Sequence, residues 1–592
     1  LQTNMAASCE KILYQSVLEL DNKQANVTLT PKYIAVEHIA KHKQGEGGIL
    51  DVKMTTIQCQ VIPLEEVIAV QPHTANIAKD KFKMRSGGAV YQAVELQPMH
   101  PTLFDVYIIK RAPKHRWRQK MLTFACKDHV ACSQWIEKIR DEIFAPGGKR
   151  PRQLLVFVNP FGGKKKAPKV FEKVRPAFDL AGVTMNVIET ERQYHARDIL
   201  QTYDLTTVDG VMCVGGDGTF SEVLNGLLDR SSKDEGIAQT FRHQPARPPL
   251  RIGVIPAGST DSIVCSTIGT NDPLTSALQI IIGDSVGVDV NALYKQEQFV
   301  KYSVTMTSYG YYGDLLADSE RLRWMGPKRY NWSGFKKIVM NKAYEGEVSF
   351  LPAEKSNGHP RDGTTCYTGC VVCQRAGKEA ELVNKALTKC ASAPAFDLGS
   401  GEYSDGSLNS DGWRTVSGKF VAINSVTVSC RCPLSPEGMS PYSHLGDGCM
   451  DLILVSNCSR VDYLRHMARI PRQGADQFDF NFIQVYRVRE FQFRPAFEEE
   501  GEEEGQAAEE EDLRSRSDGA ASLSSTGGSQ KSLKHSPSQN SVWNCDGEVI
   551  DHPKLHLQVH CQLVQLFARG VENHNMQEPE RCPVCCNPCS RC

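Results

Sequence analysis

The sequence predicts an α/β + β fold in several domains: a small N-terminal β domain, a lobe on a parallel sheet, and a mainly antiparallel β lobe. Three observations predict this fold. Short β-rich segments fill residues 10–110, strands alternate with helices from about residue 154 to 256, and alternating strands return after about residue 289. A chain of 592 residues is also too long for a single hydrophobic core.

The overall composition narrows the function classes. Lys plus Arg number 68 and Asp plus Glu number 69, a net charge of −1 that argues neither for nor against nucleic acid, and nothing else calls for such a partner. No apolar run approaches the roughly 18–20 residues of a membrane span, and the first residues lack the pattern of a secretory signal. The 21 cysteines are scattered, which favours reduced thiols in the cytoplasm.

The N-terminal domain is expected over residues 10–145. Its strands are predicted at Val27–Thr30, Tyr33–Val36, Glu66–Val70 and Phe104–Ile109. The following segment, Asp128–Phe144, predicts one amphipathic helix. The residues expected on its buried face are Val130, Trp135, Ile136, Ile139 and Ile143. Strands followed by one C-terminal helix with a buried tryptophan resemble a pleckstrin-homology domain.

A basic cluster, Lys110–Lys120, lies in this domain and holds six Lys or Arg in eleven residues around Trp117. Beside an anionic leaflet, each basic residue near the surface would gain about 1 kcal/mol. Anionic membrane lipids are therefore the partner predicted for the N-terminal domain. A solvated loop with scattered charge is the alternative, and the sequence leaves both open.

The α/β lobe is expected over residues 151–290. The predicted strands are Leu154–Val158, Val183–Ile188, Gly210–Val214 and Arg251–Ile255, and the predicted helices are Ala167–Leu180, Tyr194–Tyr203 and Thr219–Asp229. Strands separated by helices of this length indicate a parallel sheet covered by helices. Ligands of such sheets bind at the carboxyl ends of the strands.

The β lobe is expected over residues 291–570. Its predicted strands are Tyr302–Met306, Val348–Phe350, Phe420–Ile423, Leu452–Val455, Phe482–Tyr486 and Leu555–Val559. Two polar interruptions are expected, near residues 376–416 and 498–541, and the second is predicted to be disordered because of its ten acidic residues between Glu498 and Asp512. A Cys-rich tail, 571–592, follows, for which zinc binding, acylation and an alternative terminus stay open.

Four loops rich in small residues follow strands of the α/β lobe. They are VNPFGGKKK (Val158–Lys166), ETERQYHARD (Glu189–Asp198), GGDGTFSE (Gly215–Glu222) and PAGSTD (Pro256–Asp261). Backbone N–H groups and helix N-termini at such loops favour a phosphate-rich ligand. Taken alone, Asp217 could equally be the cap of its own helix, with the glycines shaping the turn.

In this order and spacing, the four loops resemble the diacylglycerol and sphingoid lipid kinase superfamily, with the closest agreement to ceramide kinases. The resemblance covers about residues 154–570, apart from the two interruptions. It includes three further motifs, YGYYGDLLADSERLRWMG (Tyr309–Gly326), HLGDGCMDLILV (His444–Val455) and WNCDGE (Trp543–Glu548). CYTGCVVC (Cys366–Cys373) matches a Cys-x3-Cys-x2-Cys motif of the ceramide kinases.

The resemblance implies transfer of the γ-phosphoryl group of ATP, with Mg²⁺, to the primary hydroxyl of ceramide, giving ceramide 1-phosphate. Asp217 would accept the hydroxyl proton, with Glu548 as the alternative, and Asp314 would lie at the lipid. The implied nucleotide contacts are Asn159, Pro160, Thr190, Glu191, Arg192, Gly215, Gly216, Gly218, Glu222, Gly258, Ser259, Thr260, Arg323, Arg329, Asp546, Gly547 and Glu548.

Competing functions stay open: a sphingosine or diacylglycerol kinase, and a catalytically inactive lipid-binding adaptor. The implied location is the cytoplasm and the cytosolic face of membranes, Golgi or plasma membrane, with peripheral attachment.

Two metal sites are candidates. The resemblance places a Mg²⁺ ligand at Asp447, where a plain Asp-Gly turn is the alternative. Cys366, Cys370 and Cys373 could bind zinc, but a fourth ligand is not evident nearby, so structural or redox-sensitive thiols are the alternative.

One basic amphipathic segment, Cys458–Gln473, is typical of helices that bind calmodulin or a membrane, which would bring Ca²⁺ dependence. A helix packed on the second lobe, with its arginines in solvent, is the alternative.

Overall fold

A computed structural model describes residues 11–39, 59–73, 102–145, 147–162, 165–241, 243–326, 328–389, 412–497 and 540–573, without the side chains of 323 and 383–389. Contacts divide the chain into two compact units. The first comprises Leu1–Val223, Pro249–Val286 and Gln565–Cys592, and the second comprises Leu224–Pro248 and Gly287–Val564. Most of the expected insertion (498–541) and of the Cys-rich tail (571–592) lies outside the described residues.

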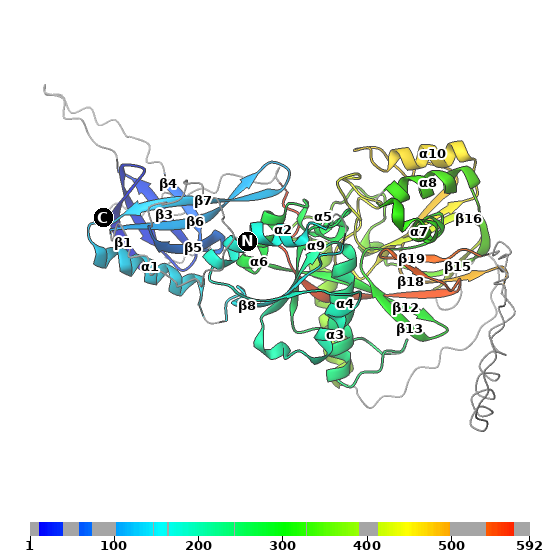
Figure 1. The fold of residues 1–592 in the computed structure, drawn as a ribbon, viewed down its shortest axis with the longest axis horizontal. Coiled ribbons are helices and arrows are strands. Elements are labelled where there is room, and N and C mark those ends of the chain that lie inside the picture. The colour runs from blue at the N-terminus through cyan, green and yellow to red at the C-terminus, as the bar shows by residue number, and fades with distance from the viewer. Residues whose placement is uncertain are drawn as a thin grey trace, which may run out of the picture. The chain divides into compact units, whose positions relative to one another are not determined.

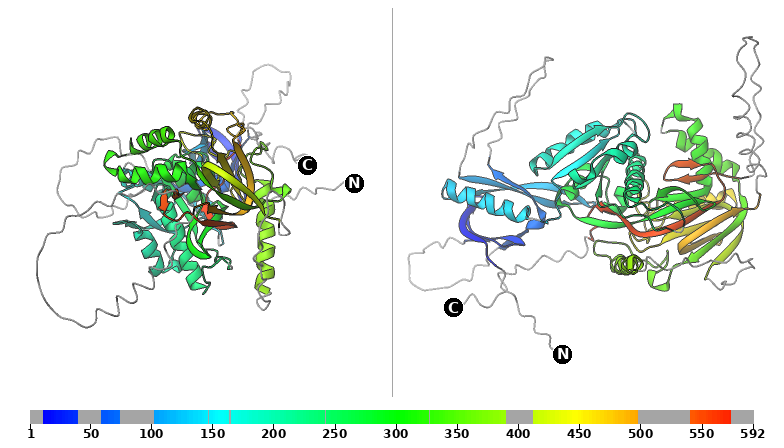
Figure 2. Two further views of the ribbon diagram at one scale, coloured as in Figure 1. Left: turned by 90° about the vertical axis from the view of Figure 1, so that its right-hand side faces the viewer. Right: turned by 90° about the horizontal axis from the view of Figure 1, so that it is seen from below.

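The N-terminal domain is an antiparallel sheet in the order β4-β3-β2-β1-β7-β6-β5, closed by helix α1 (Figure 1). Its strands are β1 (Tyr14–Leu20), β2 (Lys23–Leu29), β3 (Tyr33–His38), β4 (Cys59–Pro63), β5 (Val67–Pro72), β6 (Leu103–Ala112) and β7 (Arg116–Ala125). Helix α1 (His129–Ile143) begins where the Asp128 carboxylate accepts the Ala131 N–H, and it lies along the strands (Figure 2). Trp135 is buried as predicted. Val130 is 52% exposed, and Cys132 takes its place in the core, so that assignment was wrong.

Part of the basic cluster contacts the rest of its own unit. Trp117 is buried, and its indole N–H donates to Glu572 at 3.0 Å. Arg111 pairs with Glu572 at 2.8 Å, and Arg118 pairs with Asp272 of the α/β lobe at 2.7 Å. The solvated-loop alternative therefore fails for these three side chains, while Lys110, Lys114 and Lys120 stay exposed.

The α/β lobe is a parallel sheet in the order β11-β10-β8-β9. Its strands are β8 (Gln153–Val158), β9 (Thr184–Glu189), β10 (Gly210–Gly215) and β11 (Arg251–Pro256). Its helices are α2 (Ala167–Leu180), α3 (His195–Thr202), α4 (Asp217–Asp234), α5 (Ser262–Ile268) and α6 (Pro273–Ile282). Burial of β8 and β10 on both faces explains their continuous apolar sequences.

The second unit holds antiparallel strands in the order β20-β19-β14-β16-β15-β18-β21, with β17 beside β16 and β18, and β12 beside β13. The strands are β12 (Ser285–Lys295), β13 (Gln298–Ser303), β14 (Met306–Gly310), β15 (Tyr344–Pro352), β16 (Arg414–Val426), β17 (Met450–Ser456), β18 (Ile483–Pro495), β19 (Trp543–Cys545), β20 (Glu548–Ile550) and β21 (Leu555–Phe567). Aromatic side chains of these strands, including Tyr309, Phe493 and Trp543, form its core.

Helices also belong to this unit. Helices α7 (Tyr311–Arg321), α8 (Lys328–Met340) and α10 (Arg460–Arg469) gather on one side of the strands (Figure 1). Part of the first expected interruption, near 376–416, is helical, because Val371–Lys389 form helix α9, and residues 390–411 lie outside the described residues. Ala, Glu, Lys and Leu in this stretch favour helix although few of them can be buried. No described helix is long and apolar enough to cross a membrane.

Candidate active site

The phosphate-type loops of the α/β lobe gather at one sheet edge. Strands β8, β9, β10 and β11 run parallel, so the loops that follow their carboxyl ends lie together. Asn159 shapes the first loop: its side-chain oxygen accepts the N–H groups of Phe161 and Gly162, both at 3.0 Å. Its Nδ2 donates to Thr219 Oγ1 at 2.9 Å, which ties this loop to the start of α4.

The second loop is fixed by backbone and helix-end contacts. Thr190 is buried, and its N–H donates to the Val158 carbonyl at 2.9 Å. Arg192 is 61% exposed and pairs with Asp198 at 2.6 Å. Glu222, on α4, accepts the Ala196 N–H at 2.8 Å, so one of its oxygens caps helix α3. The loop thus presents an exposed guanidinium at the sheet edge.

Two glycine loops meet in van der Waals contact. A Cβ added at Gly258 would lie 2.6 Å from the Cα of Gly216, so any side chain there would push the loops apart. A Cβ added at Gly218 would meet nothing within 4 Å. Gly218 therefore faces open space at the helix start, where a ligand can approach the backbone closely. Ser259 and Thr260 are exposed in the adjoining loop.

Asp217 caps a different helix from its own. Its two carboxylate oxygens accept the N–H groups of Ser262 and Ile263, each at 3.0 Å, at the start of α5. Asp217 is also the first residue of α4, so it lies at the start of its own helix as well. Asp261 stands beside it, nearly buried, and accepts the Gly258 N–H at 2.8 Å. Burial, and then the charge of Asp217, raises the pKa of Asp261 to about 6.

The Asp546-Gly547-Glu548 motif forms the tight turn of the β19–β20 hairpin. Asp546 and Gly547 both have positive φ, 49° and 87°, as an Asp-Gly turn requires. The Asp546 carboxylate accepts the N–H groups of Val304, Thr305 and Met306 at 3.0 Å. Its oxygens thus anchor the hairpin to the β13–β14 turn.

Glu548 is the exposed acid of the same hairpin. Its Oε2 accepts a hydrogen bond from the Lys301 Nζ at 2.7 Å, and its side chain is 36% exposed. Burial lowers the pKa of Lys301, but the acidic groups of Cys545, Glu548 and Asp546 outweigh burial, so the pKa of Lys301 lies above its ordinary value. The lysine is therefore a fixed positive charge beside Glu548.

Asp314 lies on α7, and its carboxylate accepts the hydroxyl of Ser541 at 2.6 Å and that of Tyr344 at 2.5 Å. Arg329, on α8, is 16% exposed and pairs with Glu320 at 3.3 Å, so it is held inside the unit rather than free at its surface. Arg323 begins a short 3-10 turn, Arg323–Met325, and its side chain lies outside the described residues.

Asp447 belongs to a buried pair of acids. It is 3% exposed, and its Oδ2 is buried without a hydrogen-bond partner. Asp289, on β12, is fully buried and accepts the N–H groups of Gly448 and Gln562 at 2.7 Å. Burial raises the pKa of Asp447 to about 6, and burial followed by the charge of Asp447 raises that of Asp289. Two carboxylates with a free oxygen between Gly-rich turns fit a hard divalent cation.

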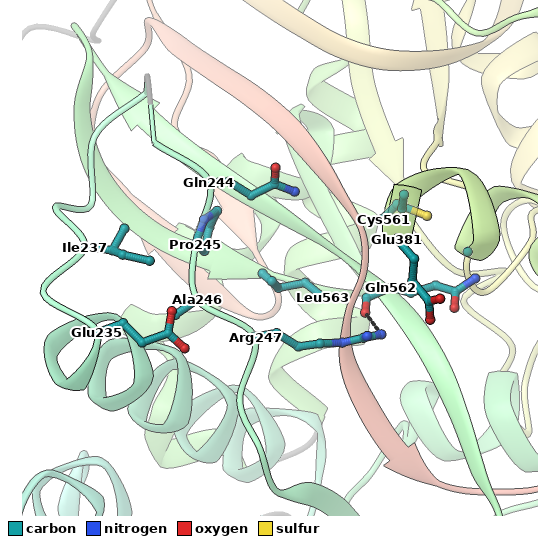
Figure 3. A pocket seen from close by; sticks show the side chains of 12 residues that line it. Glu235, Ile237, Gln244, Pro245, Ala246, Arg247, Glu381, Cys561, Gln562 and Leu563 are labelled. Carbon is teal, nitrogen blue, oxygen red and sulfur yellow. Dashed lines mark hydrogen bonds between the residues drawn. The ribbon is translucent and has the colours of Figure 1, made fainter. Parts of the chain in front are cut away.

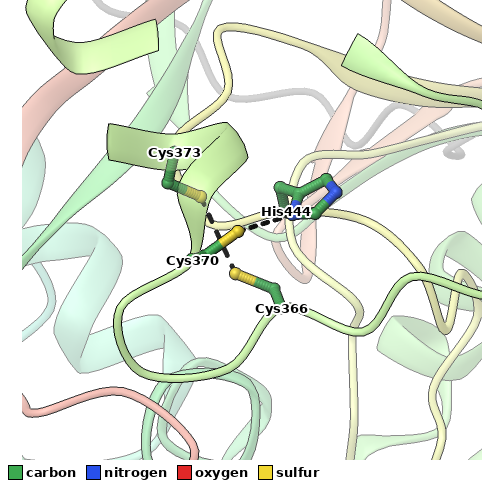
Figure 4. A group of neighbouring side chains, drawn as sticks. All are labelled: Cys366, Cys370, Cys373 and His444. Carbon is green, nitrogen blue, oxygen red and sulfur yellow. Dashed lines mark hydrogen bonds between the residues drawn. The ribbon is translucent and has the colours of Figure 1, made fainter. Parts of the chain in front are cut away.

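The three cysteines of the Cys-x3-Cys-x2-Cys motif lie together, and His444 lies with them (Figure 4). His444 is therefore the fourth candidate zinc ligand, which the sequence did not reveal because it lies 71 positions beyond Cys373. Asp261, Asp289 and His444 were all missed as site residues. A single acid or histidine gives no periodic signal, although PAGSTD ends at Asp261 and HLGDGCMDLILV begins at His444.

A separate hollow of about 410 Å³ lies in the second unit, between the chain around Ala246, the middle of α9 and strand β21 (Figure 3). Arg247 lines it and donates to the Gln562 carbonyl at 2.7 Å. None of the residues that the sequence assigned to catalysis or to the nucleotide lines this hollow.

Relatives of this chain bear on what these loops do. The chain is 41% identical to a ceramide kinase of Homo sapiens over 562 residues, covering 95% of this chain and 97% of that protein. The chain belongs to the ceramide kinase family. It is also 30% identical to a ceramide kinase of Arabidopsis thaliana, covering 79% of this chain and 81% of that protein.

Family models match three parts of this ceramide kinase family member. They are described as the ceramide kinase PH domain (residues 14–139), the diacylglycerol kinase catalytic domain (153–293) and the ceramide kinase C-terminal domain (371–589). Among solved structures, a diacylglycerol kinase from Bacillus anthracis aligns with 71% of this chain and 97% of its own, at 11% identity and a TM-score of 0.40. The predicted pleckstrin-homology domain, fold class and ATP-dependent lipid kinase activity are confirmed.

Proposed function

We propose that this protein transfers the γ-phosphoryl group of ATP, with Mg²⁺, to the primary hydroxyl of ceramide, giving ceramide 1-phosphate. One observation carries the proposal. The Asp217 carboxylate stands at the head of a glycine loop, held by two backbone N–H groups at 3.0 Å, beside Gly218, which faces open space. This arrangement supports an acid fixed next to a backbone position that a phosphate group can approach.

The nucleotide is proposed to lie on the loops after β8, β9, β10 and β11. Backbone N–H groups of these loops and the exposed Arg192 offer donors to phosphate oxygens. The proposed contacts are Asn159, Pro160, Thr190, Glu191, Arg192, Gly215, Gly216, Gly218, Glu222, Gly258, Ser259 and Thr260. Arg323, Arg329, Asp546, Gly547 and Glu548 are proposed as further phosphate-binding residues. Mg²⁺ bound with the nucleotide would neutralise part of the phosphate charge.

Asp217 is the proposed proton acceptor. The ceramide hydroxyl oxygen forms a bond to the γ-phosphorus, the bond from that phosphorus to the bridging oxygen breaks, and ADP leaves. The hydroxyl proton passes to a carboxylate oxygen of Asp217. One of these oxygens accepts the N–H of Ser262 and the other accepts that of Ile263, and a carboxylate oxygen can accept more than one hydrogen bond.

Glu548 is the weaker candidate for the base. Its carboxylate is already paired with the Lys301 ammonium at 2.7 Å, whereas Asp217 accepts the neutral N–H groups of Ser262 and Ile263. Asp546 anchors the β13–β14 turn through both carboxylate oxygens. We infer that the hairpin orients phosphate-binding groups and that proton transfer falls to Asp217.

Asp447 is the proposed ligand of a second, structural Mg²⁺, together with Asp289. Both acids are buried, and the Asp447 Oδ2 has no hydrogen-bond partner. Magnesium prefers such oxygen ligands. The ion would balance two carboxylates that burial otherwise leaves unfavourable.

Lipid substrate is proposed to reach the protein at α8. Trp332 is 55% exposed and Phe335 is 63% exposed on this helix, and the exposed Lys336 follows Phe335. Exposed aromatic rings beside lysine are typical of helices that lie in a membrane interface. The N-terminal pleckstrin-homology domain adds Lys110, Lys114 and Lys120 for anionic lipids. The Golgi and plasma membranes are the proposed sites of attachment.

Calmodulin is a further proposed partner, through α10. The helix packs on its unit through the buried Tyr463 and His466, while Val461 and Leu464 are 58% and 48% exposed beside arginines. An apolar stripe that remains exposed on a basic helix is what calmodulin binds. Recovery of the protein on calmodulin resin in EGTA as readily as in Ca²⁺, or in neither, would contradict this partner.

The activity is tested with purified protein, labelled ATP and Mg²⁺. Ceramide, sphingosine and diacylglycerol are offered separately in mixed micelles. We expect label in ceramide at a kcat/KM at least tenfold above that for the other two lipids. Preference for sphingosine or diacylglycerol would replace the substrate, and ATP binding without any transfer would indicate a lipid-binding adaptor.

A further inference from the structure

We propose that Cys366, Cys370, Cys373 and His444 bind a structural Zn²⁺ ion. The four side chains converge from two segments of the second unit (Figure 4). Their ligand atoms all lie within 4.8 Å of one another. The set of three thiols and one imidazole is one of the usual ligand sets of structural zinc.

The distances match a tetrahedral ion. With Zn–S bonds of about 2.3 Å and a Zn–N bond of about 2.0–2.1 Å, tetrahedral angles place two sulfurs about 3.8 Å apart and sulfur about 3.6 Å from nitrogen. The sulfurs of Cys366 and Cys373 are 3.7 Å apart. The sulfur of Cys370 lies 3.3 Å from Nδ1 of His444. The side chains are therefore already spaced as ligands around one centre.

A disulfide does not explain this arrangement. Bonded sulfurs are about 2.05 Å apart, whereas Cys366 and Cys373 stand at 3.7 Å. Three cysteines also leave one thiol over in any pairing. Thiolate ligands select soft or borderline metals over Mg²⁺ or Ca²⁺, which leaves zinc as the common choice.

The ion would stabilise the segment between β15 and α9, which has little regular secondary structure. Between β15 and α9, all of which the structure describes, the chain forms only a 3-10 turn, Lys355–Asn357. Cys366 and Cys370 lie at the end of this stretch, and Cys373 lies in the first turn of α9. His444 is 1% exposed, in the turn before β17. Zinc would thus join two segments that are 71 or more residues apart, which limits the freedom of the unfolded chain.

Gln562 links the segment that carries the cysteines to the segment that carries His444. The side-chain amide of Gln562 donates to the carbonyls of Cys373 and Gly446, both at 2.8 Å. Gly446 lies between His444 and Asp447, and the Leu445 carbonyl accepts the Asp289 N–H at 2.8 Å. The ion would therefore fix the turn that carries the buried Asp447. With four protein ligands, no coordination position is left for substrate, so the role is structural.

The metal content of the full-length protein tests the proposal. The protein is purified without a metal-affinity tag from cells grown with zinc, and the metal is measured by inductively coupled plasma mass spectrometry. We expect about one zinc per chain. Cys370→Ser and His444→Ala should fall below about one fifth of that value, while Cys432→Ser, at a half-buried thiol elsewhere in the unit, should keep the wild-type content. His444→Cys should retain zinc, because four thiolates also make a structural site.

A spectrum of the wild-type protein keeps the proposal testable if these variants fail to fold. Protein exchanged with Co²⁺ should show the visible bands of a tetrahedral site and near-ultraviolet thiolate charge transfer, and X-ray absorption of the zinc protein should give three sulfurs and one nitrogen. A folded wild-type protein without zinc, or zinc with oxygen ligands only, would overturn the proposal. Neither measurement depends on phosphoryl transfer, so its outcome is separate from that of the kinase assay.

Discussion

The Asp217 carboxylate accepts the backbone N–H of Ser262 at 3.0 Å, so the acid at the start of α4 closes the N-terminus of α5. This contact gives Asp217 two tasks. It stabilises a helix end whose own preceding residue, Asp261, makes no capping bond to that helix. It also fixes the carboxylate at the glycine loop. Substitutions at this position must therefore be assessed for stability as well as for turnover.

Asp217→Asn is expected to lower kcat about 10²-fold or more, because the amide cannot accept the ceramide proton. The loss of one acceptor and of the charge at the helix end should cost about 1 kcal/mol of unfolding free energy. Radiolabel transfer and a thermal melt measure the two effects. Glu548→Gln is the companion variant and should retain more than a tenth of the wild-type kcat. The reverse ranking would assign the base to Glu548.

Gly218→Ala and Gly258→Ala should fail in different ways. At Gly218 a methyl group meets no protein atom within 4 Å, so Tm should be unchanged while KM for ATP rises about tenfold or more. At Gly258 it would lie 2.6 Å from the Gly216 Cα, and overpacking of this kind costs about 1–3 kcal/mol. Melts and ATP titrations of both variants make the comparison. A normal KM in Gly218→Ala would remove the nucleotide from this loop.

The regular elements could be predicted from local pattern. The predicted and observed bounds of α2 agree at Ala167 and Leu180, because an amphipathic period and a first-turn proline mark it. Helix α9 was missed, since its polar residues resemble a loop when few are buried. Val130 was placed on the wrong face, because periodicity alone does not tell the edge of an apolar stripe from its centre.

The site could be predicted only where it is local in sequence. The glycine loops can be recognised from the small residues that follow predicted strands. The partner of Cys370, in contrast, is His444, which lies in the connection between β16 and β17 and is distant in sequence. The Asp217–Ser262 contact likewise depends on how α5 packs beside α4, which no spacing within either segment specifies. Long-range pairing of single side chains is set by the fold.

Arg487→Met should destabilise the protein by about 3–5 kcal/mol, because it leaves the buried Asp451 unpaired. The two side chains are 2% and 1% exposed, and Arg487 Nε lies 2.8 Å from Asp451 Oδ1. Arg489→Met is the matched control two residues along β18, where the pair with Glu354 is exposed, and its urea unfolding midpoint should stay at the wild-type value. Equal effects of the two variants would refute this account.

The double variant Arg487→Met/Asp451→Leu should recover part of the stability lost in Arg487→Met. It removes the unpaired carboxylate and leaves apolar side chains in its place. Urea unfolding of the double variant beside the single one shows the recovery. A double variant less stable than the single one would mean that Asp451 stabilises the protein through Ser440, whose hydroxyl donates a hydrogen bond to the Asp451 carboxylate at 2.6 Å.

His560 should make the protein acid-sensitive. Burial lowers its pKa to about 4, and its Nε2 is buried without a hydrogen-bond partner. Because the folded pKa lies below the unfolded value of about 6.5, the full stability is present above pH 6.5 and is lost as pH falls toward 4. At pH 5 the loss is about 2 kcal/mol. His560→Leu should show a smaller fall in unfolding free energy between pH 7.5 and 5, and the exposed His243→Gln should behave as wild type.

Trp332→Ala combined with Phe335→Ala should weaken binding to vesicles about tenfold or more, because two exposed rings of α8 would no longer enter the interface. Sedimentation with phosphatidylcholine vesicles containing ceramide measures this binding. Turnover of vesicle-borne ceramide should fall in parallel, while that of a short-chain ceramide dispersed in water should stay near wild type. Leu434→Ala, at a side chain that is 84% exposed elsewhere in the unit, is the control for general loss of surface apolarity. Unchanged vesicle binding of the double variant, or an equal loss in the control, would place the membrane contact on another surface.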